Sequence, residues 1–317
     1  MSRERALLEL EPPTVVRKKV LPASGDIHDY LSIAPYWWPN PDTPDGLPWV
    51  ERDGHYNRRT LDIPDKPGLY ALIGLVSVLG NAYRLIGRDA YAEKAASCLR
   101  AWFLAPATRM NPNFNFGQSI PGRADGRPMG LIETREIGRL LDGGGMIEGS
   151  AAWSLADGDR LREWVRDFLD WMAASPPAQA ERAAPNNHAT WYLAQSAAMC
   201  LFVGDDDEAA LVVQQGRPLS ERQIAADGSQ PEELRRANSR HYYLFNLLGF
   251  CRLAELGDRL EIDLWPGLRA GIERLLVDWN AWPVPTLSPM ATDESELAEV
   301  RSHAARHFGE VSCGACG

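Results

Sequence analysis

Two side-chain amides and an imidazole stand together where a helix is predicted to begin. The stretch is Pro185-Asn186-Asn187-His188, and the apolar run 191–203 that follows it has helical spacing. Backbone N–H groups at a helix start favour an anion. Amide and imidazole groups there could hold a carboxylate and move a proton beside it. The alternative reading is structural, with one Asn capping the helix and His188 serving as a half-buried spacer.

A second group of polar residues lies in the connector 227–243. Its charged and aromatic side chains after Asp227 are Glu232, Glu233, Arg235, Arg236, Arg240, His241, Tyr242 and Tyr243. Guanidinium groups bind carboxylates in a two-pronged geometry, and a tyrosine hydroxyl can transfer a proton. In a structural reading, the two adjacent Arg residues would pair with the two adjacent Glu residues on the surface, which contributes little to stability.

Two further segments have the composition of a carbohydrate-binding surface. The connector 108–127 holds three Asn, one Gln and three Arg among aromatic residues, which suits hydroxyl and carboxylate groups. The segment 24–57 is rich in Pro and aromatic residues, and such rings can stack on sugars or plug the end of a core. The candidate substrate-binding residues are Tyr36, Trp37, Trp38, Asn113, Gln118, Arg123, Trp191, Arg235 and His241.

Composition excludes several classes of protein. The chain has 317 residues, 45% of them hydrophobic, with eleven Trp, and is therefore globular. A net charge of -10 argues against general nucleic-acid binding, although a local Arg cluster could still hold a polyanion. No apolar run is expected to reach the length of a membrane span. Residues 1–10 lack the apolar core of a signal peptide, so we expect either that the chain is cytoplasmic as written or that a leader is missing from it.

The cysteines and histidines give no metal-ligand spacing. Cys98, Cys200 and Cys251 fall in apolar helical stretches and are expected in the core. Cys313 and Cys316 form one isolated CxxC pair, which is weak evidence for zinc. We predict no metal and no cofactor.

Hydrophobic periodicity predicts an all-α protein. Helices are expected over 69–86, 90–104, 147–155, 160–174, 188–203, 208–215, 242–256, 268–279 and 296–308. Tight turns containing Gly and Asp, at 87–89, 157–159, 204–205 and 257–258, are expected to separate them. Successive helical hairpins indicate an α/α toroid, complete or incomplete. We expect one domain over 1–317, with an arm at 1–22, an aromatic covering loop at 23–66 and a flexible tail at 309–317.

Four motifs in order resemble the alginate lyase superfamily of α/α-toroid polysaccharide lyases. They are Ser24-Gly-Asp-Ile-His with Pro35-Tyr-Trp-Trp-Pro, Arg109-Met-Asn-Pro-Asn with Gln118-Ser-Ile-Pro-Gly-Arg, Asn186-Asn-His, and Gln230-Pro-Glu-Glu-Leu-Arg-Arg with Tyr242. The resemblance runs from Ser24 to about Trp265. The long aromatic N-terminal segment is closer to the branch that includes glucuronan lyases. The portion after Trp279 matches poorly.

The resemblance implies β-elimination on a 4-linked uronic acid polymer, and a periplasmic or secreted location. It assigns Asn187, His188 and an Arg to neutralising the C5 carboxylate, and Tyr242 to protonating the glycosidic oxygen. The Arg is Arg236 when counted from the Glu-Leu pair and Arg235 when counted back from the Tyr, and we favour Arg236. The base is Tyr242 where the C5 proton and C4 oxygen share a face of the sugar, and His188 where they do not.

Two rival functions remain open. A non-catalytic uronan-binding toroid would keep the aromatic and Arg residues without needing His188 or Tyr242. A glycoside hydrolase would need two carboxylates across the scissile bond, for which Asp26, Asp29, Glu133 and Glu233 are candidates. The sequence does not place any two of these together. It also leaves the oligomeric state open.

Overall fold

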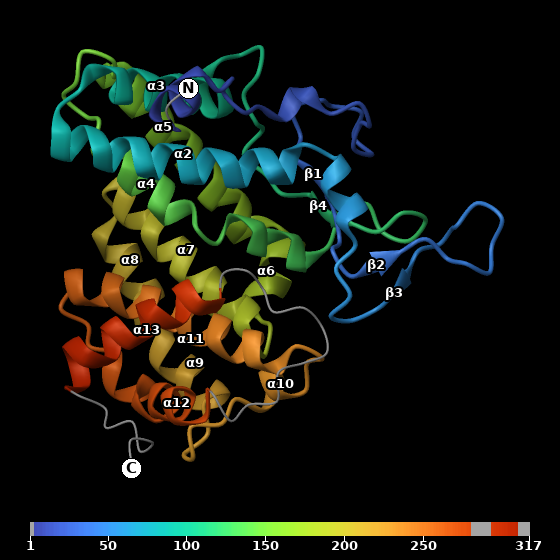
Figure 1. Cartoon of the computed structure of the whole chain (residues 1–317), viewed down its shortest axis with the longest axis vertical. Coiled ribbons are helices and arrows are strands. Elements are labelled where there is room, and N and C mark those ends of the chain that lie inside the picture. The colour runs from blue at the N-terminus through green and yellow to red at the C-terminus, as the bar shows by residue number, and fades with distance from the viewer. Residues whose placement is uncertain (1–2, 280–292, 310–317) are drawn as a thin grey trace. The chain divides into compact units, whose positions relative to one another are not determined.

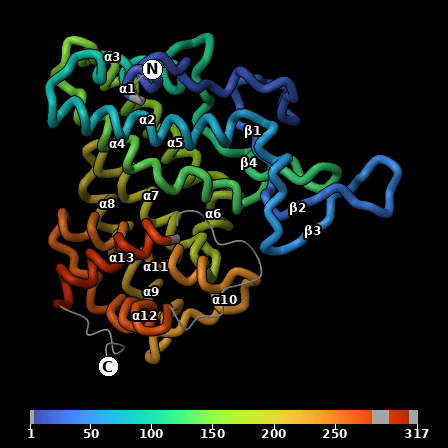
Figure 2. Tube along the Cα trace, viewed as in Figure 1, coloured from blue at the N-terminus to red at the C-terminus, as the bar shows by residue number. Residues whose placement is uncertain are grey.

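The computed structural model describes residues 3–279 and 293–309 (Figures 1 and 2). Helices account for 63% of it and strands for 4%, which confirms the all-α fold class. The elements are α1 (Arg3–Glu9), η1 (Val15–Arg17), β1 (Leu31–Ile33), β2 (Trp37–Trp38), β3 (Val50–Glu51), η2 (Arg58–Asp62), α2 (Asp65–Ile86), α3 (Asp89–Leu99), η3 (Arg100–Leu104), β4 (Phe116–Ser119), η4 (Pro128–Thr134), α4 (Ile137–Gly145), α5 (Leu155–Ala174), α6 (Pro176–Arg182), α7 (Asn187–Val203), α8 (Asp206–Gln214), α9 (Gly216–Gln223), α10 (Pro231–Leu234), α11 (Ser239–Arg259), α12 (Trp265–Asp278) and α13 (Asp293–Phe308).

The chain forms two compact units. Unit 1 comprises Met1–Glu51, Tyr56–Gln179 and Phe202–Gly204, and unit 2 comprises Arg52–His55, Ala180–Leu201 and Asp205–Gly317. The short segment Arg52–His55 therefore belongs to unit 2, although the chain on both sides of it belongs to unit 1. The single-domain assignment for 1–317 remains a prediction, and the predicted tail lies outside the described residues from 310 onward.

The long helix α2 is the centre of unit 1. It packs against α3 and α4, which lie along it in Figure 1. Its contact with α4 is made by glycines, because a Cβ atom added to Gly80 would lie 2.1 Å from the carbonyl oxygen of Gly143. Two buried ion pairs, Lys18–Asp65 and Lys66–Glu133, fix the start of α2 to the N-terminal segment and to η4. These contacts hold the covering loop in place.

Helix α2 also corrects the expectation that no apolar run could span a membrane. By length and composition alone, it is long and apolar enough to do so, and 44% of its most apolar window is buried. Its hydrophobicity has another physical source, since Leu72 and Val76 are fully buried between neighbouring helices. The absence of a membrane span stays a prediction.

The covering loop contains short strands that the sequence pattern did not predict. Strand β1 pairs in parallel with β4, and β2 pairs antiparallel with β3. The four strands are two to four residues long, which is too short for alternation to be recognised. They place Trp37 and Trp38 opposite Glu51 and Val50.

Helix α11 is the centre of unit 2. It packs against α8, α9, α10, α12 and α13 and is buried on most of its faces, from His241 to Gly257. Within it, the Tyr243 hydroxyl donates to the carbonyl oxygens of Gly228 and Gly271. This anchors the first turn of α11, where Tyr242 lies, to the connector before α10 and to α12.

Two of the four Gly-Asp turns are where the sequence predicted them. Gly87 ends α2 at φ 73°, and Asp205 caps α8 by accepting from the Glu208 N–H. The other two predictions were wrong. Ser154 and Asp157 form a capping box that starts α5, so Gly158 lies inside that helix. Gly257 lies inside α11, where a Cβ atom would be 2.4 Å from the Ile262 carbonyl oxygen.

One predicted helix was also wrong. Residues 147–153 form turns, and the helix of this region is α4, upstream at Ile137–Gly145. The predicted helix 90–104 is α3 followed by a π-helical turn, η3. The remaining predicted helices agree with the structure to within a few residues at each end.

Candidate active site

Asn187 is the first residue of α7 and is held by a buried carboxylate. The Glu233 carboxylate accepts the Asn187 backbone N–H at 2.7 Å and the side-chain Nδ2 at 3.0 Å from each of its oxygens. Both residues are 1% exposed. Burial raises the pKa of Glu233, while the Asn187 hydrogen bonds and the charges of Arg236 and His188 act in the opposite direction. Glu233 is therefore close to three of the four predicted catalytic residues.

His188 follows on the same helical turn and has its own buried partner. Its Nδ1 lies 2.6 Å from Oε1 of Glu181, whose side chain is 1% exposed. Because a carboxylate only accepts hydrogen bonds, Nδ1 carries the proton in this pair. The other nitrogen, Nε2, is then the one that can take up a proton. The His188 side chain is 16% exposed, so the ring is partly accessible.

The structure separates the two Arg candidates. Arg236 places its guanidinium carbon 3.8 Å from the centroid of the Tyr242 ring, and its Nη2 is 2.8 Å from Oδ1 of Asp53. Arg235 instead pairs with Glu232 at 2.5 Å, and 71% of its side chain is exposed. The geometry brings Arg236, and not Arg235, to Tyr242.

Tyr242 and His241 lie in the first turn of α11. Tyr242 is 8% exposed, and the His241 ring meets it edge-on at 5.2 Å. His241 is itself stacked on Phe245 at 5.5 Å. Trp191 is also in this unit, but it is 1% exposed and packs on Phe245. In the structure it is a core residue, and its role in binding substrate remains a prediction without support from its burial.

The aromatic candidates of unit 1 have different surroundings. Trp37 is 6% exposed, with the guanidinium carbons of Arg123 and Arg127 at 5.1 and 5.9 Å from its ring centroid. Tyr36 and Trp38 are half-buried. Trp37 therefore serves mainly as a platform for two cations, while Tyr36 and Trp38 keep some surface for a ligand.

The amide candidates of unit 1 are engaged in internal hydrogen bonds. Asn113 donates through Nδ2 to Asp29 at 3.0 Å. Gln118 is 5% exposed, and its Oε1 accepts from Arg127 at 2.6 Å. Gln118 has a positive φ of 50°, a backbone conformation uncommon for residues other than Gly. Both side chains are tied into the connector by these contacts, and their role in binding substrate remains a prediction.

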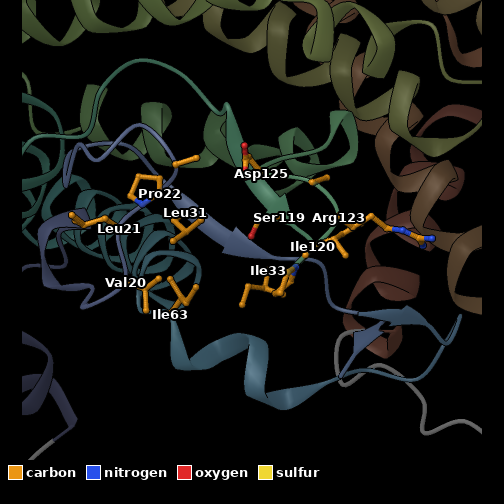
Figure 3. Close-up of a pocket in the computed structure, with 14 residues that line it drawn as sticks. Val20, Leu21, Pro22, Leu31, Ile33, Ile63, Ser119, Ile120, Arg123 and Asp125 are labelled. Carbon is orange, nitrogen blue, oxygen red and sulfur yellow. The ribbon is translucent and has the colours of Figure 1, made fainter. Parts of the chain in front are cut away.

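Arg123 lies at the edge of a cavity in unit 1 of about 410 Å³. Figure 3 shows its side chain running away from the aliphatic residues of the lining, among them Val20, Leu21 and Ile63. Ser119 and Asp125 are other polar side chains of the lining. We assign this cavity no part in the candidate catalytic site, because Asn187, His188, Arg236 and Tyr242 all belong to unit 2.

The candidate hydrolase acids are committed to structural networks. Glu133 pairs with Lys66 and accepts from the hydroxyls of Tyr30 and Ser32. Asp29 accepts from Ser24, Asn111 and Asn113. Asp26 accepts from the His28 N–H and from Asn111. Asp26 and Asp29 share the Asn111 amide as a donor, and Glu233 is held by Asn187. All four carboxylates are thus engaged in internal hydrogen bonds or ion pairs.

One group among the described residues could hold a metal ion. Glu255, Glu299 and His303 bring a ligand atom each to within 4.8 Å of one another. Arg252 pairs with both carboxylates, and Arg306 lies 2.8 Å from Nδ1 of His303. Two guanidinium groups already neutralise the two carboxylates, so we read the group as an ion-pair network. Cys313 and Cys316 lie outside the described residues.

Sequence reasoning missed the acidic partners of the site. Glu181 lies seven residues before His188, and Asp53 lies 183 residues from Arg236. An acidic residue one or two helical turns before a His is too common to single out Glu181. No local pattern connects Asp53 to the connector before α11.

Comparisons with known proteins identify the family of the chain. The family model for alginate lyase matches residues 14–279. An alginate lyase from Bacteroides ovatus is 32% identical, with a TM-score of 0.88, and the match covers 95% of this chain and 83% of that chain. Alginate lyase A1-III from Sphingomonas species A1 is 16% identical, with a TM-score of 0.59 and coverages of 98% and 87%.

A further match is a histidine-to-alanine variant of alginate lyase A1-III complexed with tetrasaccharide. It is 16% identical, with a TM-score of 0.60 and coverages of 96% and 82%. At this identity the two A1-III structures support the fold alone. A search of curated proteins finds no match. The family model and the Bacteroides structure together decide the assignment: the chain belongs to the alginate lyase family of polysaccharide lyases.

Proposed function

We propose that this protein cleaves alginate, a 4-linked uronic acid polymer, by β-elimination at a site formed by Asn187, His188, Arg236 and Tyr242. The observation that carries the proposal is the position of Glu233. Its carboxylate is hydrogen-bonded to Asn187 and lies within electrostatic reach of Arg236 and His188. Arg236 in turn stacks on Tyr242. Polar residues from two segments of the sequence, 187–188 and 236–242, thus lie around Glu233 and Arg236.

Such a cluster suits the difficult step of the reaction. The C5 proton of a uronate is weakly acidic, because its removal places a second negative charge beside the carboxylate. Hydrogen-bond donors and a cation on that carboxylate stabilise the enolate-like intermediate. Asn187, His188 and Arg236 supply an amide, an imidazole and a guanidinium for this purpose.

The proton transfers then fall to Tyr242 and His188. A base removes the C5 proton, the electron pair forms the C4–C5 double bond, and the C4–O bond breaks. The Tyr242 hydroxyl gives its proton to the leaving oxygen. Where both bonds lie on one face of the sugar, the Tyr242 phenolate can first accept the C5 proton and then return it to the oxygen. Where they lie on opposite faces, His188 accepts the proton through Nε2, while Glu181 stabilises the imidazolium.

The substrate class is inferred from the relatives and from the side chains. The relative that is 32% identical is an alginate lyase. Glucuronan is the second candidate substrate. Its C5 proton and C4 oxygen share a face of the sugar, as they do in mannuronate. In unit 1, Tyr36, Trp38 and Arg123 have partly accessible side chains, and we propose that they bind sugar rings and carboxylates of the polymer.

A panel of uronans tests the proposal. Elimination creates a conjugated double bond, so ultraviolet absorbance should rise when the protein is mixed with mannuronate-rich alginate, guluronate-rich alginate or glucuronan. We expect a rise with at least one alginate. Binding without any rise in absorbance would support a non-catalytic uronan-binding protein instead. New reducing ends without a rise in absorbance would support a hydrolase.

A further inference from the structure

We propose that Asp53 is a positioning residue that holds the Arg236 guanidinium against the Tyr242 ring and offsets part of its charge. The inference rests on the proposed function, because it gives a role in that reaction to a residue outside the four named above. Asp53 does not touch the reacting atoms in this scheme. It acts through Arg236.

The contacts of Asp53 fix the guanidinium on one edge. Its carboxylate oxygens lie 2.8 Å from Nη2 and 3.5 Å from Nε of Arg236, and Oδ2 also accepts the Ala237 N–H at 3.2 Å. The backbone contact holds the carboxylate in place independently of the ion pair.

The surroundings make this pair different from an ordinary surface ion pair. The Arg236 side chain is 23% exposed and the Asp53 side chain 39% exposed. Burial raises the pKa of Asp53, but the hydrogen bond and charge of Arg236 and the N–H groups of Ala237 and Gly54 outweigh it and lower the pKa below its ordinary value. Asp53 is therefore negatively charged at neutral pH.

The charge of Asp53 matters because of what lies on the other side of the guanidinium. A cation 3.8 Å from the Tyr242 ring centroid favours negative charge on the phenol oxygen. A carboxylate bound to that cation weakens the effect. Asp53 thus sets how readily Tyr242 ionises and keeps Arg236 in the stacked orientation. Removing the charge and removing the anchor should have separate consequences.

Two substitutions separate the consequences. Asp53→Asn keeps an oxygen that can accept from Arg236 but removes the negative charge, whereas Asp53→Ala removes both. The matched control is Glu232→Gln, because Glu232 pairs with the adjacent Arg235, which is 71% exposed and makes no stacking contact with Tyr242. Asp53 is partly exposed, so we expect all three variants to fold.

The first measurement is the pH dependence of kcat/KM on the uronan that the wild type cleaves. We expect the limb set by Tyr242 ionisation to move to lower pH by about half a unit or more in Asp53→Asn, since a full positive charge then faces the phenol. This is the acidic limb on a substrate for which the Tyr242 phenolate is the base, and the alkaline limb on one for which the Tyr242 hydroxyl is only the acid. We expect Asp53→Ala to lose kcat by about tenfold relative to Asp53→Asn, since the anchor is gone. Glu232→Gln should overlay the wild type. A profile for Asp53→Asn that also overlays the wild type would overturn the proposal.

The second measurement does not depend on activity. The ionisation of Tyr242 can be followed by ultraviolet tyrosinate absorbance, with the curve of the Tyr242→Phe variant subtracted to remove the other eight of the nine tyrosines. We expect the difference curve to move to lower pH in Asp53→Asn and to stay in place in Glu232→Gln. An unmoved curve in Asp53→Asn rejects the role of Asp53. If no uronan is cleaved but the curve moves, the coupling of Asp53 to Tyr242 stands and the proposed function fails.

Discussion

The guanidinium carbon of Arg236 lies 3.8 Å from the centroid of the Tyr242 ring. This contact connects the residue proposed to bind the uronate carboxylate with the residue proposed to move the proton. A cation placed there can bind the substrate anion and favour the phenolate. The same contact distinguishes Arg236 from Arg235, which the sequence motif alone could not do.

Tyr242→Phe should abolish elimination. The substitution removes the hydroxyl but keeps the ring that Arg236 stacks on, so the proton carrier is lost while the packing remains. We expect kcat to fall by at least about 10³-fold, with little change in oligosaccharide affinity measured by calorimetry. Retention of most of the activity would show that another group carries the proton.

Arg236→Ala and Arg235→Ala should differ sharply. Removing Arg236 takes away the proposed carboxylate clamp and the cation on Tyr242, and kcat/KM should fall by about 10²-fold or more. Arg235 forms an exposed ion pair with Glu232, so its removal should change kcat/KM by less than about threefold. Equal losses would contradict the assignment of Arg236.

Asn187→Ala should reduce turnover more than affinity. The amide contact to the uronate carboxylate is proposed to strengthen as negative charge develops on it, so its loss falls mainly on the transition state. We expect kcat to fall about 10²-fold, with KM changed much less, in steady-state kinetics. A rise in KM alone would mean that Asn187 only binds the substrate.

Glu181→Gln should affect substrates unequally. The buried Glu181 carboxylate can stabilise an imidazolium form of His188 only while it is charged. Guluronate, whose C5 proton and C4 oxygen lie on opposite faces, would need His188 as the base. We expect the ratio of activity on guluronate-rich to mannuronate-rich alginate to fall in this variant. An unchanged ratio would leave His188 as a donor to the carboxylate only.

The sequence predicted the parts of the site that are local in the chain. Asn187 and His188 could be placed at a helix start because a polar pair precedes a long apolar run, and α7 begins at Asn187. Tyr242 could be proposed from its motif, which left Arg235 and Arg236 as alternatives for the carboxylate clamp. Asp53 could not, because its contact joins residues 183 positions apart and depends on the path of the covering loop.

The errors in the helix boundaries have the same origin. Gly257 was predicted to end a helix, since glycine often does so. In the structure it lies within α11, where the Ile262 carbonyl leaves no room for a side chain. A turn at 157–159 was predicted to separate two helices. In the structure the Ser154–Asp157 capping box starts α5 at Leu155, so these residues lie inside the helix. Close packing and side-chain capping decide these positions, and periodicity does not report either.

The stability of the protein should depend on pH through Glu233. Burial raises its pKa in the folded protein above the ordinary value of 4.5. At pH values between 4.5 and the raised pKa of Glu233 in the folded protein, the folded state holds a proton that the unfolded state has released. The free energy of unfolding therefore falls as pH rises through this window.

The Glu233→Gln variant has no carboxyl group to titrate at this position and should lack this contribution. Its absolute stability will also change, because an amide cannot accept all three Asn187 contacts. The quantity to compare is therefore the slope of the free energy of unfolding against pH, measured by urea unfolding from about pH 4 to 7. The wild type should lose stability relative to Glu233→Gln as pH rises, and Glu232→Gln should follow the wild type. Parallel curves for the wild type and Glu233→Gln would show that Asn187 and Arg236 compensate the burial of this carboxylate completely.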